Sequence, residues 1–391
     1  IYKGVADAPD RFALYNIVRQ EGGKIISVEE AKSNWLDLKY WNSFLSRVTE
    51  YEKILFARNL GAMLEAGLPL ARALAVIERQ TKNAKMSGIV SSIESDIRRG
   101  DTLHAAFAKF PHAFSRLFVA MIRAGEEGGD LPASLKVVSD QMERMYSLKK
   151  KIRGAMIYPS IIMIAVVGLG FLMMTQVVPT LAQTFAEAGA DLPKSTQFVI
   201  GLSNFLVDNT ILALGIIIGA IASVYFIAHT KQGRRGFDFT FLHIPLIGSM
   251  VREVNAARMS RTMASLLSAG VDVLTALEIV GDVVQNSYFR EVIKDSARGV
   301  GSGEPLSASF IRREDLYPAF VGEMMAVGEE TGQIAEMLKR LALYYEEEVD
   351  RKTKDMSTIV EPFLMIFIGT TVGFFAISMI TPIYSLSSAI N

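Results

Sequence analysis

The sequence LEAGLPLARAL at residues 64–74 recurs, with substitutions, as LSAGVDVLTAL at residues 267–277. The same offset of 203 positions maps residues 58–179 onto residues 261–382 without a gap. Each copy begins as a polar region with helical periodicity and ends in a long stretch without charge. An internal repeat indicates two copies of one structural unit. The chain is therefore predicted to be a duplicated helical module anchored in a membrane.

Three stretches contain no charged residue: residues 154–186, 209–230 and 362–391. A bilayer core of about 30 Å is crossed by roughly 20 apolar helical residues. We therefore expect transmembrane helices at residues 154–178, 210–228 and 359–381. The alternative, three buried helices of a soluble protein, is disfavoured because such long uncharged runs are difficult to bury otherwise.

The flanks of these stretches predict the orientation in the membrane. Basic residues precede the first span, follow the second and precede the third: Lys149, Lys150, Lys151 and Arg153; Lys231, Arg234 and Arg235; Arg351, Lys352 and Lys354. Positively charged flanks remain in the cytoplasm. Both large polar regions and the N-terminus are thus expected in the cytoplasm, and residues 179–209 and the C-terminal tail, 382–391, on the other side.

The predicted fold is an all-α integral membrane protein. Two duplicated cytoplasmic six-helix bundles are expected at residues 49–153 and 229–358, and the last helix of each is expected to continue into the membrane. Residues 1–48 differ from the rest, because a helical turn ending at Gly22-Gly23 is followed by the alternating segment KIISV at residues 24–28. They are predicted to form a small N-terminal α/β appendage.

Motifs for catalysis and for cofactor or metal binding are missing from the sequence. It has no phosphate-binding loop, no zinc-protease motif, no nucleophile elbow and no cysteine, and its four histidines are scattered. The sequence therefore predicts no enzyme, no cofactor and no metal site. A transporter is also disfavoured, because transport pathways usually place ionisable groups inside the bilayer.

The most distinctive polar motifs are GEEGGD at residues 125–130 and GEETG at residues 328–332. One interpretation is a glycine-bounded turn with its acids at the start of the following helix, where negative charge is favourable. A second is an acidic edge at which Glu126, Glu127, Glu329 and Glu330 bind a partner. A third is a divalent cation held by Glu126, Glu127 and Asp130, although no EF-hand spacing is present.

Two prolines occupy equivalent positions at the start of the first and third spans. Pro159 and Pro362 are related by the offset of 203. A proline within a helix frees a backbone acceptor and can bend the helix. The sequence therefore predicts paired structural hinges at the cytoplasmic membrane surface.

In these motifs the chain resembles the inner-membrane platform proteins of type II secretion systems and type IV pili. The resemblance spans nearly the whole chain and is carried by LEAGLPL at 64–70, RAGEEGG at 123–129, GEETG at 328–332, LPKSTQ at 192–197, Tyr158-Pro159 and Glu361-Pro362. It implies a non-enzymatic scaffold in the bacterial inner membrane. Such a scaffold links a cytoplasmic hexameric assembly ATPase to pilins or pseudopilins.

The resemblance also implies the remaining partners. They are other inner-membrane assembly proteins, membrane lipid and further copies of the chain, but not nucleic acid. Asn204-Phe205 and the segment Tyr384-Ser385-Leu386 favour a pilus machine. The platform of a type II secretion system is the alternative, and a transporter subunit is a distant third.

Overall fold

The computed structural model describes residues 47–187, 193–245 and 247–390. The α/β appendage predicted for residues 1–48 lies, apart from its last two residues, outside the described residues. The chain divides into two compact units, residues 1–47 with 83–85 and the remaining residues. Apart from the first two residues of α5, all helices below belong to the second unit. Throughout the described ranges every regular element is a helix, which confirms the predicted helical class.

Two series of helices follow the sequence repeat. The first series is α3 (Glu50–Glu65), α4 (Leu70–Gln80), α5 (Ala84–Arg98), α6 (Leu103–Ala108), α7 (Arg116–Glu127) and α8 (Leu131–Leu172). The second is α13 (Ile247–Ser268), α14 (Val273–Val283), α15 (Ser287–Gly301), α16 (Leu306–Ile311), α17 (Ala319–Glu330) and α18 (Ile334–Ile390). Adding 203 to both bounds of α4, α5, α6 and α7 gives the bounds of α14, α15, α16 and α17.

Glycines in the left-handed conformation end corresponding helices in both series. Gly67 has a φ of 82° and Gly270 a φ of 83°. The N–H of the next residue, Leu68 or Val271, donates to the carbonyl of Met63 or Leu266 at 3.0 Å. This is the pattern of a Schellman cap, and only glycine adopts it without a Cβ penalty.

A single hydrophobic core connects both series. In the first series Phe107 packs edge-to-face on Phe114, with 4.5 Å between ring centroids. The equivalent pair in the second series is Phe310 and Tyr317, at 5.0 Å. Tyr317 is completely buried, and its hydroxyl finds no hydrogen-bond partner in the described part of the chain. Burial raises the pKa of this phenol. The second copy therefore carries an unpaired polar group where the first carries none.

Three helices are long and apolar enough to cross a membrane. The first is α8, which continues through the π-helical turn η1 (Met173–Val177) into α9 (Val178–Glu187); the others are α11 (Thr210–His229) and α18. Each of them includes most or all of one of the three predicted spans. The first helix extends past the predicted end at residue 178, because the π-helical turn η1 accommodates Pro179, which has no N–H to donate, and α9 continues beyond it.

Two further helices lie beside these spans. The connection 179–209, for which no helix was predicted, contains α10 (Lys194–Asp208) after the end of α9. Its Ser203 hydroxyl donates to the carbonyl of Met174 in η1, and Thr196 donates to the carbonyl of Ser378 in α18 at 2.6 Å. α12 (Lys231–His243) joins α11 to α13 and packs against both α13 and α15.

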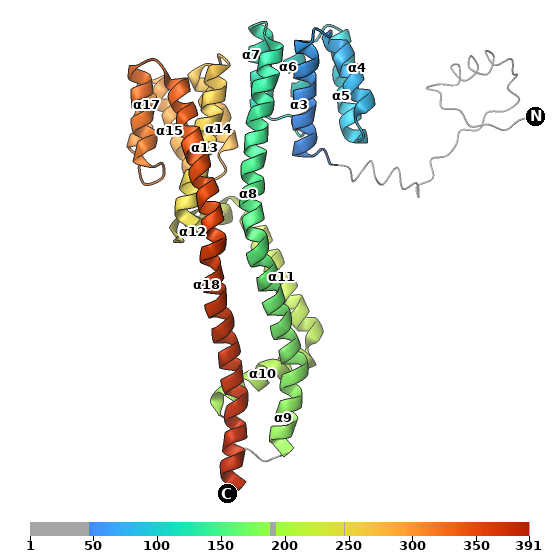
Figure 1. The fold of residues 1–391 in the computed structure, drawn as a ribbon, viewed down its shortest axis with the longest axis vertical. Helices are drawn as coiled ribbons and strands as arrows, with labels where there is room; N and C mark the ends of the chain where they lie inside the picture. The colour runs from blue at the N-terminus through green and yellow to red at the C-terminus, as the bar shows by residue number, and fades with distance from the viewer. Residues whose placement is uncertain (1–46, 188–192, 246, 391) are drawn as a thin grey trace, which may run out of the picture. The chain divides into compact units, whose positions relative to one another are not determined.

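Helices α8 and α18 run side by side from the polar region into the apolar region (Figure 1). Each is continuous across the boundary, as the sequence predicted for the last helix of each polar region. We call α3–α7 with residues 131–153 of α8 the first module, and α13–α17 with residues 334–355 of α18 the second module. Each module is therefore joined to a membrane-crossing helix without a loop.

Candidate functional surfaces

The glutamates of the acidic motifs lie at the ends of α7 and α17 and not at the starts of the following helices. The carboxylate of Glu126 accepts hydrogen bonds from the backbone N–H of Leu103 at 2.8 Å and of His104 at 3.2 Å. It also contacts the His104 ring nitrogen Nδ1 at 2.7 Å. Glu126 therefore caps the N-terminus of α6, a helix 23 residues earlier in the chain.

The second copy repeats this cap. Glu329 accepts hydrogen bonds from the backbone N–H of Leu306 and Ser307 and from the Ser307 hydroxyl at the start of α16. Negative charge at a helix N-terminus is favourable, since it faces the positive end of the helix dipole. Burial opposes ionisation of Glu126, but the hydrogen bonds from Leu103 and His104 outweigh it and hold the pKa of Glu126 below its usual value. The first glutamate of each motif thus has a structural contact that the sequence pattern did not reveal.

The second glutamate of each motif is exposed. Glu127 pairs with Arg123 of its own helix, at 2.7 Å, and Glu330 is likewise exposed. Asp130 caps α8 by accepting from the N–H of Ala133 at 3.1 Å. Within the described ranges, no group of three or more His, Asp or Glu side chains is placed to hold a metal ion.

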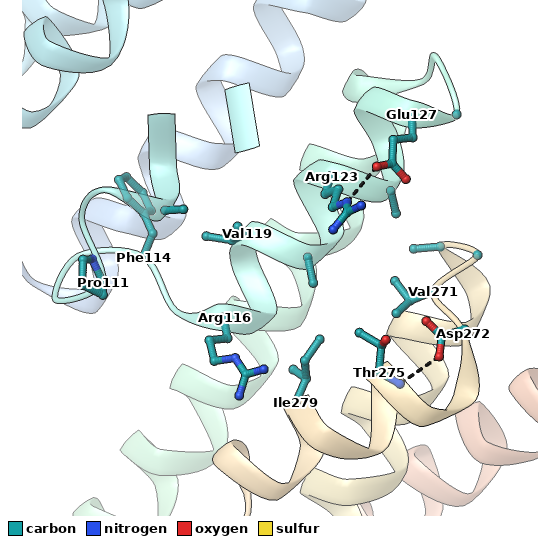
Figure 2. A pocket seen from close by; sticks show the side chains of 16 residues that line it. Pro111, Phe114, Arg116, Val119, Arg123, Glu127, Val271, Asp272, Thr275 and Ile279 are labelled. Atoms are coloured by element: carbon teal, nitrogen blue, oxygen red, sulfur yellow. Dashed lines mark hydrogen bonds and ion pairs between the residues drawn. The ribbon is translucent and has the colours of Figure 1, made fainter. Parts of the chain in front are cut away.

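A cleft of about 890 Å³ lies between α7 and α14, next to the Gly270 turn (Figure 2). Its walls are mainly apolar, with Phe114 and Val119 on one side and Val271 and Ile279 on the other. Charged side chains line its margins: Arg116, Arg123, Glu127 and Asp272. Within the lining, the Asp272 carboxylate caps α14 by accepting a hydrogen bond from the Thr275 N–H at 2.9 Å.

Polar contacts join the two modules across their interface. Arg116 of α7 pairs with Asp282 of α14 at 3.0 Å and lies 3.5 Å from Glu278. On α8, the Gln141 amide donates to the Thr262 hydroxyl at 3.2 Å and accepts from the Ser265 hydroxyl at 3.1 Å. Because Gln141 is 2 % exposed, this network is internal to the chain.

One ion pair occurs in both modules in different surroundings. Arg58 of α3 pairs with Glu143 of α8, and Arg261 of α13 pairs with Glu346 of α18. The second pair is bidentate, with both N···O distances 2.8 Å, and Arg144 of the first module approaches Glu346 to 3.9 Å. The sequence repeat contained these matched residues, but it could not reveal that one pair is covered and the other exposed.

The predicted hinges lie in the interiors of the two long helices. Pro159 is within α8 and Pro362 within α18, and both side chains are at least partly exposed. A proline leaves the carbonyl four residues earlier without its helical donor. Near Pro159, the Ser160 hydroxyl donates to the carbonyl of Met156 at 2.7 Å. Bending at these prolines stays a prediction.

Comparison with known proteins gives a family match and several relatives. A family model described as type II secretion system (T2SS), protein F matches residues 56–179 and 259–382. These stretches are related by the offset of 203 and together make up more than half of the chain. The type IV pilus assembly protein PilC of Thermus thermophilus is 35 % identical over 337 residues, which cover 86 % of this chain and 83 % of the relative.

Relatives named as pilus assembly proteins and relatives named as secretion proteins align with similar shares of this chain. The type IV pilus assembly protein PilC of Pseudomonas aeruginosa is 33 % identical over 347 residues, 88 % of this chain and 92 % of the relative. The type II secretion system protein F of Aeromonas hydrophila is 29 % identical over 341 residues, 87 % of each chain.

Proposed function

The chain belongs to the type II secretion system protein F family, and on this basis we propose that it is the inner-membrane platform protein of a type IV pilus assembly machine. In this role it couples a cytoplasmic hexameric assembly ATPase to the insertion of pilin subunits into the filament. The proposal assigns no catalysis to the chain, and the motor is a separate protein.

The observation that carries the proposal is the continuity of α8 and α18. Each helix begins in a packed polar module and continues into an apolar segment long enough to cross a membrane. A helix without an intervening loop transmits displacement because its backbone hydrogen bonds resist bending. A push on either module would therefore reach the membrane segment and any pilin beside it.

The proposed topology follows the basic flanks. Residues 1–48, a first six-helix bundle at 49–153 and a second at 229–358 are cytoplasmic, and residues 179–209 and 382–391 are extracytoplasmic. The agreement of helix bounds at the offset of 203 supports two bundles of one architecture. Under this topology the polar faces of both modules are accessible to the ATPase.

We propose that the two glutamates of each acidic motif have different roles. Glu127 and Glu330 are exposed and would contact a basic surface of the ATPase. Glu126 and Glu329 cap α6 and α16 and would hold the motif in shape. Charge reversal at the exposed pair should therefore weaken docking without unfolding the module, whereas reversal at the capping pair should also reduce stability.

The function is tested by pull-down of the full-length chain in detergent with the assembly ATPase from the same genome. Saturable binding that falls at least tenfold with Glu127→Lys and Glu330→Lys supports the platform role and the docking edge. Glu291→Lys is the matched control, because this exposed glutamate belongs to the second module but not to the acidic motif. Undiminished binding by the double variant refutes the edge, and no binding by the folded chain argues against coupling to that ATPase.

The type II secretion alternative is separated by phenotype. The pilus-named relatives described above are 33–35 % identical and the secretion-named relative 29 %, but further pilus-named relatives are 28–29 % identical, so the choice of a pilus machine rests on Asn204-Phe205 and residues 384–386. Deletion of the gene should then abolish surface pili while extracellular enzyme secretion continues. Loss of secretion with normal piliation would assign the chain to a secretion system.

The hinges are tested by replacing Pro159 and Pro362 with alanine together. We expect normal abundance in the membrane and reduced filament assembly, since alanine restores a straight helix. Equal loss of abundance and assembly would reduce the prolines to a folding role.

A further inference from the structure

A face of the first module is exposed although its equivalent in the second module is buried. We call it the tyrosine face; it consists of Tyr51, Leu55, Arg58, Glu143 and Tyr146 on α3 and α8. Tyr51 and Tyr146 lie against each other, with ring centroids 6.4 Å apart. Tyr51 is 59 % exposed and Tyr146 36 %. Exposed neighbouring aromatic and aliphatic side chains mark an interaction surface.

In the second module, α8 of the first module covers the corresponding positions. Val254 and Val349, the equivalents of the two tyrosines, are 9 % and 0 % exposed and pack against Leu148 of α8. The ion pair shows the same difference, because the Arg58 side chain is 48 % exposed and that of Arg261 7 %. The contact between the modules is therefore one-directional: the first module covers the second, and nothing in the described part of the chain covers the first.

The first module covers the second with a surface formed by α7 and α8. The equivalent surface of the second module, formed by α17 and α18, is exposed. We call it the α18 face; it consists of Phe320, Glu323, Tyr344, Glu347 and Arg351. Phe320 is 42 % exposed and packs edge-to-face on Tyr344, with 5.4 Å between centroids. Glu323, Glu347 and Arg351 are also exposed. One chain thus has two unoccupied faces that correspond to the two sides of its own internal interface.

We propose that the α18 face of one copy binds the tyrosine face of a second copy, repeating between chains the contact that joins the two modules within a chain. The occupant is a second copy because the two faces are equivalent to the two sides of the internal interface. Where Arg144 lies 3.9 Å from Glu346 inside the chain, Glu347 would lie near Glu143, so the neighbouring half-exposed Arg58 would face both carboxylates. Where Leu148 meets two valines inside the chain, Arg351 would meet Tyr51 and Tyr146, an arrangement suited to cation–π attraction.

Charge complementarity extends to the neighbouring cleft. Inside the chain, Ala120 and Glu127 line the cleft opposite Thr275. At the position equivalent to Ala120, Glu323 of one copy would lie opposite Arg72 of the other, which is exposed and is the equivalent of Thr275. The acidic α18 face therefore opposes a basic margin of the tyrosine face, and such opposition fixes orientation and excludes mismatched pairings.

The membrane is compatible with this repetition. Because α8 and α18 run side by side in the same direction, a contact that repeats their relation keeps the membrane segments of both copies parallel. The contact joins two different faces, so it is heterologous, and its repetition generates a ring or an open chain and not a two-fold dimer. This proposal does not depend on the platform function or on the ATPase.

The absence of cysteine from the sequence makes site-specific cross-linking direct. One full-length copy would carry Ala62→Cys and a differently tagged full-length copy Tyr344→Cys. These positions are equivalent to Ser265 and Gln141, which hydrogen-bond at 3.1 Å within the chain. The two copies would be co-expressed, and their membranes treated with a short bis-maleimide. A single chain carrying Gln141→Cys and Ser265→Cys provides the internal reference.

We expect a cross-linked species carrying both tags, at a yield within about threefold of the internal reference. Either single-cysteine copy alone should give none. Arg72→Glu in the first copy should reduce the yield at least fivefold, and Glu323→Arg in the second should restore it. Absence of the doubly tagged species while the internal reference cross-links overturns the proposal. Cross-linking of either single-cysteine copy to itself also overturns it, because that result indicates a two-fold contact.

Discussion

Removal of the Glu346 carboxylate should destabilise the protein far more than removal of its repeat equivalent, Glu143. Both glutamates pair with an arginine of the first helix in their module, and both lie at the same position of a duplicated fold. The variants Glu346→Ala and Glu143→Ala therefore delete the same group from the same local structure. They differ only in what surrounds the pair.

The magnitude follows from burial. The side chains of Arg261 and Glu346 are 7 % and 17 % exposed, and both guanidinium contacts are 2.8 Å. Breaking a buried, hydrogen-bonded pair by deleting one partner costs about 3–5 kcal/mol, because the remaining charge is left in a poorly solvated site. Arg144 at 3.9 Å would lose its counter-charge as well. The pair of Glu143 is half-exposed, and such pairs are worth about 0.2–1 kcal/mol.

The assay is thermal unfolding of the full-length chain in detergent, followed by pulse proteolysis with the cleavage sites identified by mass spectrometry. A loss of about 3 kcal/mol from a module of this size lowers its midpoint by roughly 12 °C or more, and a loss below 1 kcal/mol by a few degrees. Glu346→Gln keeps the shape and one hydrogen bond, so it should fall between wild type and Glu346→Ala. Equal midpoints for Glu346→Ala and Glu143→Ala would refute the reasoning that coverage by α8 makes the second pair critical.

Three further predictions use the same unfolding measurement. Gly125→Ala should lower the free energy of unfolding by about 1–3 kcal/mol, because a Cβ there would overlap the Ser134 side chain and lie 3.1 Å from the Asp130 carbonyl. Gly88→Ala is the control, because the space around Gly88 is open, and it should raise the free energy of unfolding by up to about 1 kcal/mol. If Gly88→Ala were the less stable variant, the packing described for Gly125 would be wrong. Tyr317→Phe should stabilise the protein by about 1 kcal/mol, since it removes an unpaired buried hydroxyl. The reverse change at the equivalent position, Phe114→Tyr, should destabilise the protein. A loss of stability in Tyr317→Phe would mean that the hydroxyl has a hydrogen-bond partner. The pKa of Glu126 is lower in the folded state than its ordinary value of 4.5. The stability that ionised Glu126 contributes to the fold is therefore fully present above pH 4.5 and is lost as the pH falls through the pKa of the folded state. Glu126→Gln should therefore reduce the loss of stability on acidification below about pH 4.5, and an unchanged pH profile would exclude this role.

The sequence predicted the helical class, the repeat and the three apolar helices because these depend on local signals. Charge-free length sets the spans, and three- and four-residue spacing of apolar side chains sets the helices. Glycines such as Gly67 and Gly270 end helices at the same repeat positions, since the left-handed conformation is a property of the residue itself. Such features need no knowledge of what lies far away in the chain.

The tertiary structure decided what each repeated residue does. Glu126 and Glu127 are neighbours in one motif, but Glu126 caps a helix 23 residues earlier and Glu127 faces solvent. Arg58 and Arg261 are the same residue in the repeat, yet only Arg261 is covered by α8 of the other module. A duplicated sequence specifies the same local fold twice, but a one-directional contact between the copies gives equivalent side chains different solvation. Burial, ion-pair strength and the free faces of this protein are therefore determined by long-range packing.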